Sequence, residues 1–284
     1  MPLQGWNWRG DRDCPECEAS SGIMTFTTAE SKRLIAKAVV AMPQVRAALE
    51  RGRVIVGGGT TNAYIAEELL GKPVAPGYFT KGIICHGLLC TTFRSPDWIK
   101  PFSFVNGVPV DREWSEVLKE FDADDVMIKG ANAVDPEGNA GVLLGSPVGG
   151  TIGASLPIVM ARGSHLIIPV GLEKLVPSVI TASRKCGLKR LKYPDGATVG
   201  YMPVVGATVV TEIDALRILT GVDATLVASG GVGGAEGAVV LVVEGPDQRV
   251  RSAFQLWESI KGEPAVDSPI AARYGIDARS GSGG

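Results

Sequence analysis

A glycine run followed by polar side chains is the first stretch whose composition suits chemistry. Its members are Gly57, Gly58, Gly59, Thr60, Thr61 and Asn62. The run stands between a β-branched stretch at 53–56 and a helical stretch that Gly71 ends, so its N–H groups and the positive end of the helix dipole face one space. This pattern predicts contact with a phosphate or carboxylate, and a tight turn without a ligand is the alternative. The run departs from the dinucleotide fingerprint, because Asn62 occupies the place of the last glycine.

Polar residues also follow a second apolar stretch, at 126–129. They are Lys129, Asn132, Asp135 and Glu137. Because α/β proteins place ligand groups at the C-terminal ends of parallel strands, we expect Lys129 to pair with an anion and Asn132 to hydrogen-bond a ligand. Asp135 or Glu137 would serve as the catalytic general base or nucleophile. The alternative is a solvated loop, since Asp-Pro-Glu-Gly is also an ordinary turn sequence.

Two more glycine-rich stretches and a histidine complete the candidate residues. The stretch 145–153 precedes a helix, so Gly149 and Gly150 are expected to contact a ligand, although close backbone packing explains them equally well. The stretch 230–234 is more simply read as a flexible connection between two strands. His86 stands at a strand end as a candidate acid or base, and a hydrogen-bonded, partly buried imidazole is the alternative.

The cysteines supply only part of a zinc site. Cys14 and Cys17 form half of a zinc knuckle, and Cys85, His86 and Cys90 carry further ligand atoms. The last three lie in an apolar stretch, however, where cysteine usually packs as a small hydrophobe. We therefore expect no metal.

The composition favours a globular metabolic protein. The 284 residues include 28 basic and 30 acidic side chains, which gives a net charge of -2 and no strongly basic face for nucleic acid. No stretch of about 18 uninterrupted apolar residues predicts a membrane span. Five cysteines and the lack of a secretory signal predict reduced thiols and a cytoplasmic location. A symmetric homo-oligomer is expected, as for many soluble metabolic proteins.

The elements that must position these residues alternate between strand and helix, which predicts an α/β fold with a mainly parallel sheet and helices on both faces. Thr27 and Glu30 form a capping-box pattern at the start of the first helix. We predict an N-terminal extension at 1–23, a single α/β domain at 24–270 and a flexible tail at 271–284. Strands are expected at 53–56, 82–90, 126–129, 165–170, 224–230 and 237–245. Helices are expected at 62–70, 115–121, 152–161, 211–219 and 250–262, and irregular chain at 91–113.

Three passages resemble signature regions of a large superfamily. They are GGGTTNAYIAEEL (57–69), DDVMIKGANAVDPEGNAGVLLG (124–145) and HLIIPVGLEKLVPS (165–178). The superfamily is the NagB/RpiA/CoA-transferase-like one, which holds ribose-5-phosphate isomerase, glucosamine-6-phosphate deaminase, CoA transferases and initiation-factor-2B-like isomerases. Within it the chain resembles the lactate-utilisation (LUD) family most. In many members the third passage runs on to a lysine, for which Lys174 is the candidate.

The resemblance implies a NagB/RpiA/CoA-transferase-like fold and an anionic metabolite as substrate. That metabolite would be a phosphosugar or an acyl-CoA, and the enzyme an isomerase or a transferase, with CoA as the one cofactor implied. The initiation-factor-like isomerases use an aspartate where this sequence has Asn132, and Glu137 is the counterpart of the nucleophilic glutamate of CoA transferases. The alternative is a LUD-like, non-catalytic accessory protein of lactate utilisation that acts through partners.

Overall fold

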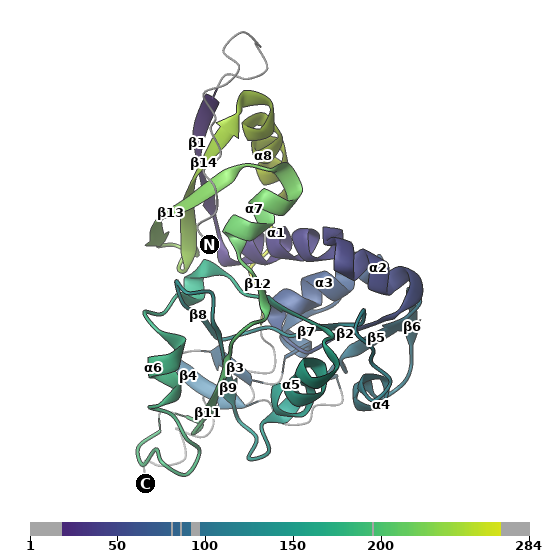
Figure 1. Cartoon of the computed structure of the whole chain (residues 1–284). Coiled ribbons are helices and arrows are strands. Elements are labelled where there is room, and N and C mark those ends of the chain that lie inside the picture. Colours follow the sequence, from purple (N-terminus) through teal and green to yellow (C-terminus); the bar gives the residue numbers. More distant parts are fainter. Residues whose placement is uncertain (1–18, 81, 86, 92–96, 195, 268–284) are drawn as a thin grey trace, which may run out of the picture.

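The computed structural model describes residues 19–80, 82–85, 87–91, 97–194 and 196–267 (Figure 1). The strands are β1 (Ala19–Phe26), β2 (Arg53–Val56), β3 (Gly82–Cys85), β4 (Leu88–Thr91), β5 (Phe102–Val105), β6 (Val108–Val110), β7 (Val126–Ile128), β8 (Ala133–Val134), β9 (Ala140–Leu144), β10 (His165–Pro169), β11 (Gly200–Val204), β12 (Thr208–Val210), β13 (Asp223–Gly230) and β14 (Ala238–Pro246). The helices are α1 (Thr28–Ala41), α2 (Pro43–Arg51), α3 (Thr60–Leu70), α4 (Trp114–Leu118), α5 (Gly150–Arg162), α6 (Val179–Ser183), α7 (Glu212–Thr220) and α8 (Asp247–Ile260). Short 3-10 turns lie at η2 (Pro76–Tyr78) and η3 (Leu172–Lys174).

A six-stranded, mainly parallel sheet forms the centre of the molecule. Its order is β12-β10-β7-β2-β5-β6. The first four strands run parallel, whereas β5 is antiparallel to β2 and β6 is antiparallel to β5. The prediction of a mainly parallel α/β sheet is therefore confirmed.

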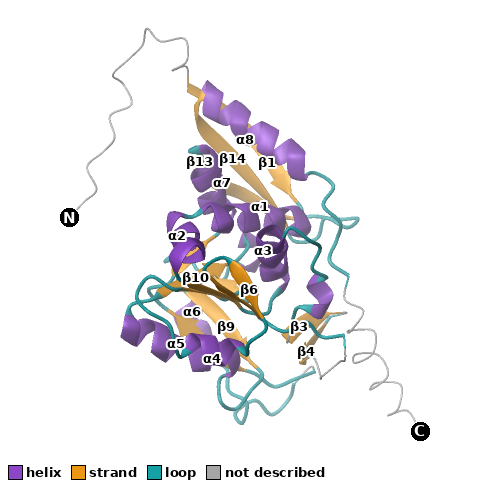
Figure 2. Cartoon of the chain, turned by 90° about the vertical axis from the view of Figure 1, so that its right-hand side faces the viewer, coloured by secondary structure: helices purple, strands orange, loops and turns teal. Residues whose placement is uncertain are grey.

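Alternate residues of the central strands point to opposite sides, and both sides are covered by helices. In β2, Val54 and Val56 belong to a buried cluster that includes Leu34 of α1. Ile55 belongs to a second cluster, together with Val117 of α4 and Ile152 of α5. Because a strand buried on both faces needs apolar residues at every buried position, it has the uninterrupted β-branched stretch seen at 54–56. Figure 2 shows α1, α2 and α3 on one side of this sheet and α4 and α5 on the other.

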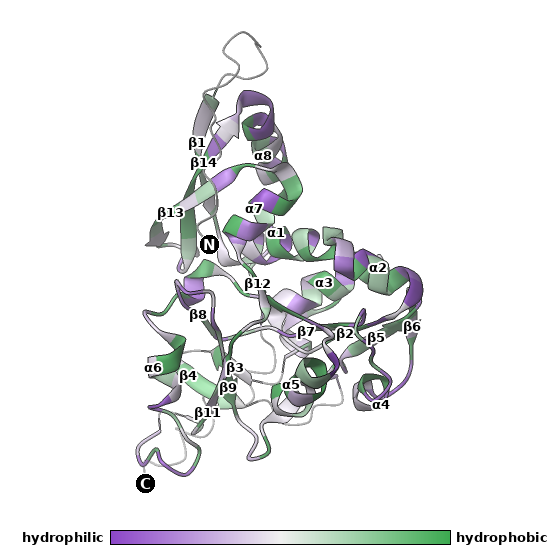
Figure 3. Ribbon diagram, in the orientation of Figure 1, coloured by the Kyte–Doolittle hydropathy of each residue, from purple (hydrophilic) through white to green (hydrophobic). Residues whose placement is uncertain are grey.

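A second, three-stranded sheet of order β1-β14-β13 stands beside α7 and α8 (Figure 1). Its Phe26 and Leu241 lie in the same buried cluster as Val54 of the central sheet. Hydrophilic and hydrophobic residues alternate along α1, α7 and α8, as expected of helices that bury one side (Figure 3). The two sheets therefore share one hydrophobic core.

The beginning of β1 corrects the predicted N-terminal boundary. Residues 19–23, predicted to belong to an extension, are paired with β14 along a register that starts at Ala19 opposite Pro246. This pairing uses backbone groups, so it needs no regular apolar pattern in the sequence. The remaining part of the predicted extension and the predicted tail at 271–284 lie outside the described residues.

Two regions predicted to be a single strand and irregular chain are β-hairpins in the structure. The single strand predicted at 82–90 is two antiparallel strands, β3 and β4, with Gly87 at φ 73° between them. The region 91–113, predicted to be irregular, contains β5 and β6, joined by Asn106 and Gly107 at φ 49° and 75°. An Asn-Gly pair with positive φ is the favoured two-residue hairpin turn, so this second signal was present in the sequence.

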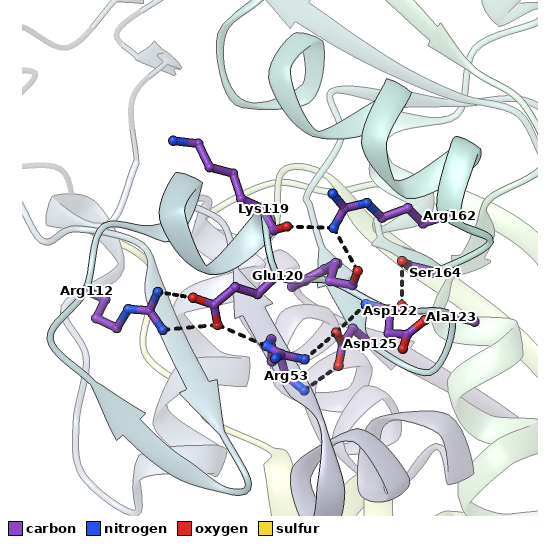
Figure 4. Close-up of polar contacts among 10 residues, drawn as sticks. Arg53, Arg112, Lys119, Glu120, Asp122, Ala123, Asp125, Arg162 and Ser164 are labelled. Carbon is purple, nitrogen blue, oxygen red and sulfur yellow. Dashed lines mark hydrogen bonds and ion pairs between the residues drawn. The ribbon is translucent and has the colours of Figure 1, made fainter.

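Asp125 holds together the edge of the central sheet at which β2 and β7 begin (Figure 4). Its side chain is 2% exposed and accepts hydrogen bonds from the backbone N–H of Arg53 at 2.6 Å and from that of Asp122 at 2.6 Å. The Arg53 guanidinium adds an ion pair at 3.2 Å. Glu120 then joins Arg53 to Arg112. Every carboxylate in this network already has a basic partner, which gives it a structural role.

Replacing Asp125 by alanine is expected to lower the free energy of unfolding by about 3 kcal/mol, because two backbone amides and a guanidinium lose their shared, buried acceptor. Urea unfolding followed by circular dichroism would measure the change. Asp124→Ala, an exposed aspartate one residue away, is the matched control and should unfold close to the wild-type midpoint. Equal midpoints for the two variants would contradict this role.

Candidate functional site

A cavity of about 510 Å³ lies at the C-terminal ends of β2 and β7. Its wall is built from the loops at 58–61 and 129–132, from the start of α5, and from parts of the β3–β4 hairpin. Pro169 at the end of β10 and Lys174 in η3 also line the cavity. This volume is typical of small-molecule sites, and the C-terminal edge is where α/β sheets bind ligands.

The structure brings most of the predicted ligand residues to this cavity. Those on its wall are Gly58, Gly59, Thr60, Thr61, Lys129, Asn132, Gly149 and Gly150. The two others lie behind the wall. Gly57 donates its N–H to the Ile128 carbonyl at 2.9 Å, and the fully buried Asn62 donates its Nδ2 to the Gly57 carbonyl at 2.7 Å. Gly57 and Asn62 therefore shape the first loop from inside.

Two of the three glycine N–H groups of the first loop are already used by hydrogen bonds within the protein. The N–H of Gly57 is used by Ile128, and that of Gly59 by the Phe79 carbonyl at 2.6 Å. Gly59 is the N-cap of α3 and offers no capping side chain. The first-turn N–H groups of an α-helix have no partner within the helix, so Thr60 and Thr61 present donors at the cavity.

The start of α5 repeats this arrangement on the opposite wall. Gly149, at φ 79°, is the N-cap and again supplies no side-chain hydrogen bond. A Cβ at Gly149 would lie 3.0 Å from the Cα of Gly153, so this glycine also permits close backbone packing. The close backbone packing is therefore observed at Gly149, ligand contact stays a prediction, and two uncapped helix starts line one cavity.

Three lysines from three separate elements line the same cavity: Lys32 of α1, Lys129 after β7 and Lys174 of η3. The Nζ atoms of Lys32 and Lys174 lie 3.7 and 3.8 Å from one carboxylate oxygen of Glu173. Lys129 donates to the Gly130 carbonyl at 3.1 Å. Lys32 was not among the residues predicted from the sequence, although helical periodicity places it on the buried side of α1, where a charged residue is unusual.

The protein environment weakens the positive charge of two of these lysines. Enclosure in the cavity wall, followed by repulsion from Lys174, lowers the pKa of Lys129 to about 8. Burial also lowers the pKa of Lys32 below its ordinary value, although Glu173 acts in the opposite direction. A bound anion would stabilise the positive charges of both lysines, so the electrostatics of the cavity favour the binding of an anion.

Two glutamates lie behind the lysines. Glu212 is fully buried and accepts the Leu172 N–H at 2.9 Å. Burial, together with the nearby charge of Glu173, raises the pKa of Glu212 to about 7. Neither glutamate is among the residues that form the cavity wall. They therefore act on a ligand only through the lysines.

The carboxylates predicted to be catalytic lie away from the cavity wall. Asp135 is 3% exposed and accepts the backbone N–H groups of Val179 at 2.9 Å and of Asn139 at 2.8 Å. Burial alone would raise its pKa, but these hydrogen bonds outweigh burial and hold the pKa below its ordinary value. Glu137 is exposed in the following turn. Asp135 thus organises its own loop, and the turn interpretation of Asp-Pro-Glu-Gly describes this segment.

His86, the third predicted catalytic residue, lies outside the described residues, as do Cys14 and Cys17. Over the ranges that the structure covers, no three His, Cys, Asp or Glu side chains are grouped so that they could hold a metal ion. Nor does any helix in those ranges combine the length and apolar character needed to cross a membrane.

Comparison of the chain with protein-family models, with curated proteins and with solved structures finds no match. The cavity, its three lysines and the two helix starts are therefore the features that bear on function.

Proposed function

We propose that the cavity binds a small metabolite with more than one negative charge, and that the chain acts on it as an isomerase-type enzyme. The observation that carries the proposal is the set of three lysines lining one cavity together with the uncapped starts of α3 and α5. Among the described residues of the wall there is no Asp or Glu side chain to neutralise them from within. Glu173, which is not part of the wall, is shared by Lys32 and Lys174. The positive charge that this single carboxylate leaves uncompensated favours a bound anion.

A phosphosugar suits this cavity better than an acyl-CoA. A phosphate would occupy the first-turn N–H groups at Thr60 and Thr61, with lysine ammonium groups around it. The thioester mechanism of a CoA transferase needs a glutamate nucleophile, and Glu137 lies away from the wall. The mainly parallel sheet with its ligand loops at the C-terminal edge supports, as part of the proposal, a place in the NagB/RpiA/CoA-transferase-like superfamily.

A LUD-like accessory role is the second candidate. It is favoured by one observation, namely that no described residue of the wall carries a carboxylate or an imidazole, the usual general bases. Such a protein would bind an organic acid or a related anion without turning it over, and would act through a partner.

A thermal-shift series would test anion binding and choose the ligand class. Wild type would be heated with ribose 5-phosphate, inorganic phosphate, CoA, acetyl-CoA and lactate. We expect the phosphosugar to give the largest rise in melting temperature, since a ligand at about 100 times its Kd stabilises the native state by about 2.7 kcal/mol. Lys174→Met should weaken the apparent affinity for the phosphosugar about tenfold and should therefore give a smaller rise in melting temperature. Lys72→Met, at an exposed lysine away from the cavity, should give the same rise as wild type.

The outcome separates the two candidate functions. A shift with the phosphosugar, together with its interconversion detected by NMR, supports the enzyme. Binding of lactate or another organic acid without turnover supports the accessory role. The absence of a shift with every ligand would contradict both.

A further inference from the structure

Lys129 differs from the other two lysines of the cavity in its surroundings. Lys32 and Lys174 share the carboxylate of Glu173. Within the described part of the chain, Lys129 has no carboxylate within 4.0 Å of its Nζ, and it donates only to the Gly130 carbonyl. Lys32 and Lys174 are thus paired with Glu173, whereas the Lys129 amine forms no ion pair with any described residue.

The stem of Lys129 is positioned by the first glycine loop. A Cβ at Gly57 would lie 3.2 Å from the Cδ of Lys129 and 3.2 Å from the Ile128 carbonyl oxygen, a spacing tighter than ordinary side-chain contact. The absence of a side chain at Gly57 therefore lets Lys129 lie across the loop. The same loop leads directly into Thr60 and Thr61, whose N–H groups are the proposed phosphate donors. The Lys129 amine and the proposed phosphate donors at Thr60 and Thr61 therefore come from neighbouring parts of the cavity wall.

The chemical state of Lys129 is suited to nucleophilic attack. Only a neutral amine attacks a carbonyl carbon, and a pKa of about 8 leaves roughly a tenth of this side chain neutral at pH 7. An ordinary lysine has more than a hundredfold less of the neutral form. The residue is half-buried and lines the cavity, so the amine is desolvated yet within reach of a ligand.

We propose that Lys129 forms an imine with the carbonyl group of a phosphorylated aldehyde or ketone. This inference rests on the proposed function and names its substrate class. The Nζ lone pair forms a bond to the carbonyl carbon, the bond from that carbon to oxygen breaks, and the oxygen leaves as water with the two amine protons. No oxidation or reduction takes place. The imine nitrogen takes up a proton from solvent water, and the resulting cation withdraws electrons from the adjacent carbon. The proton lost from that carbon passes to solvent water, and the return of a proton to the neighbouring carbon completes the isomerisation.

Reductive trapping tests the inference on the full chain. The protein would be incubated with glycolaldehyde phosphate and sodium borohydride, digested, and mapped by mass spectrometry. We expect one adduct per chain, on Lys129, that saturates with probe concentration and is suppressed by inorganic phosphate. Unphosphorylated glycolaldehyde at the same concentration should label Lys129 at least tenfold less.

Three variants complete the experiment. Lys129→Met should lose the adduct and Lys72→Met should retain it. Lys129→Arg keeps the positive charge without the reactive amine, so it should lose the adduct while phosphate still raises its melting temperature. Labelling that is spread over exposed lysines and unchanged in Lys129→Met would overturn the inference.

A missing adduct has two distinguishable meanings. If phosphate still raises the melting temperature of wild type, the imine is refuted and the anion site stands. If phosphate has no effect either, the proposed function fails together with the imine.

Discussion

Replacing Lys129 by methionine is expected to raise the melting temperature of the protein by about 2–5 °C at pH 7, even as it removes the proposed reactive amine. Methionine keeps most of the side-chain volume over Gly57 and removes a charge that the cavity wall and Lys174 disfavour. After allowance for solvent in the cavity, this corresponds to about 1–2 kcal/mol. Residues that serve function at the expense of fold stability are common at active sites.

The pH dependence gives this prediction a second readout. The pKa of Lys129 is about 8 in the folded chain, against its ordinary value of 10.5, so between these values the unfolded chain binds more protons. The unfolding free energy of wild type should therefore rise with pH across this window, relative to Lys129→Met. The advantage of the variant should be largest below pH 8 and should vanish towards pH 10.5.

Differential scanning calorimetry at several pH values between 7 and 10 would measure both effects, with Lys72→Met as the exposed control. A lower melting temperature for Lys129→Met at pH 7 would mean that the hydrogen bond to the Gly130 carbonyl outweighs the desolvated charge.

Replacing Glu212 by glutamine is expected to stabilise the protein above neutral pH by about 3 kcal/mol. Glutamine keeps an oxygen for the Leu172 N–H and removes the charge whose burial raises the pKa of Glu212 to about 7. Since this pKa exceeds the ordinary value of 4.5, the folded wild-type chain binds more protons than the unfolded chain between these values. The unfolding free energy of wild type should therefore fall as the pH rises from 4.5 to 7, and the variant should show a smaller fall.

Urea unfolding at pH 5, 6, 7 and 8 would measure the two slopes. Glu50→Gln, at an exposed glutamate, is the control and should follow wild type at each pH. Identical slopes for wild type and Glu212→Gln would show that the buried carboxylate is compensated at all pH values, with Lys32 as the nearest candidate.

Local patterns in the sequence predicted individual elements well. The capping box at Thr27 and Glu30 begins α1, and Gly71, at φ 64°, ends α3. These signals depend on contacts within a few residues, so no distant partner is needed to interpret them. Hairpins were harder, because the stretch at 82–90 is apolar throughout and only the positive φ at Gly87 divides it into β3 and β4.

The candidate site was predicted in part for the same reason. Glycine loops that precede helices are visible in the sequence, and they led to Thr60, Thr61 and the start of α5. Lys32 comes from another element and reaches the cavity only because α1 packs on the central sheet beside α3. The position of Asp135 behind the wall could not be predicted from the sequence, since its backbone partner Val179 lies far along the chain.

By itself, the sequence determined the class of the fold, the mainly parallel sheet and the sheet edge at which the candidate ligand residues lie. These follow from hydrophobic periodicity, glycine placement and the direction of parallel strands. Only the tertiary structure decided which charged side chains share the cavity and what their surroundings do to them. Desolvation and Coulomb interaction act through space over a few ångströms, whereas Lys32, Lys129 and Lys174 are separated by long stretches of chain. Their convergence, and the lowered pKa of Lys129, exist only once the chain has folded.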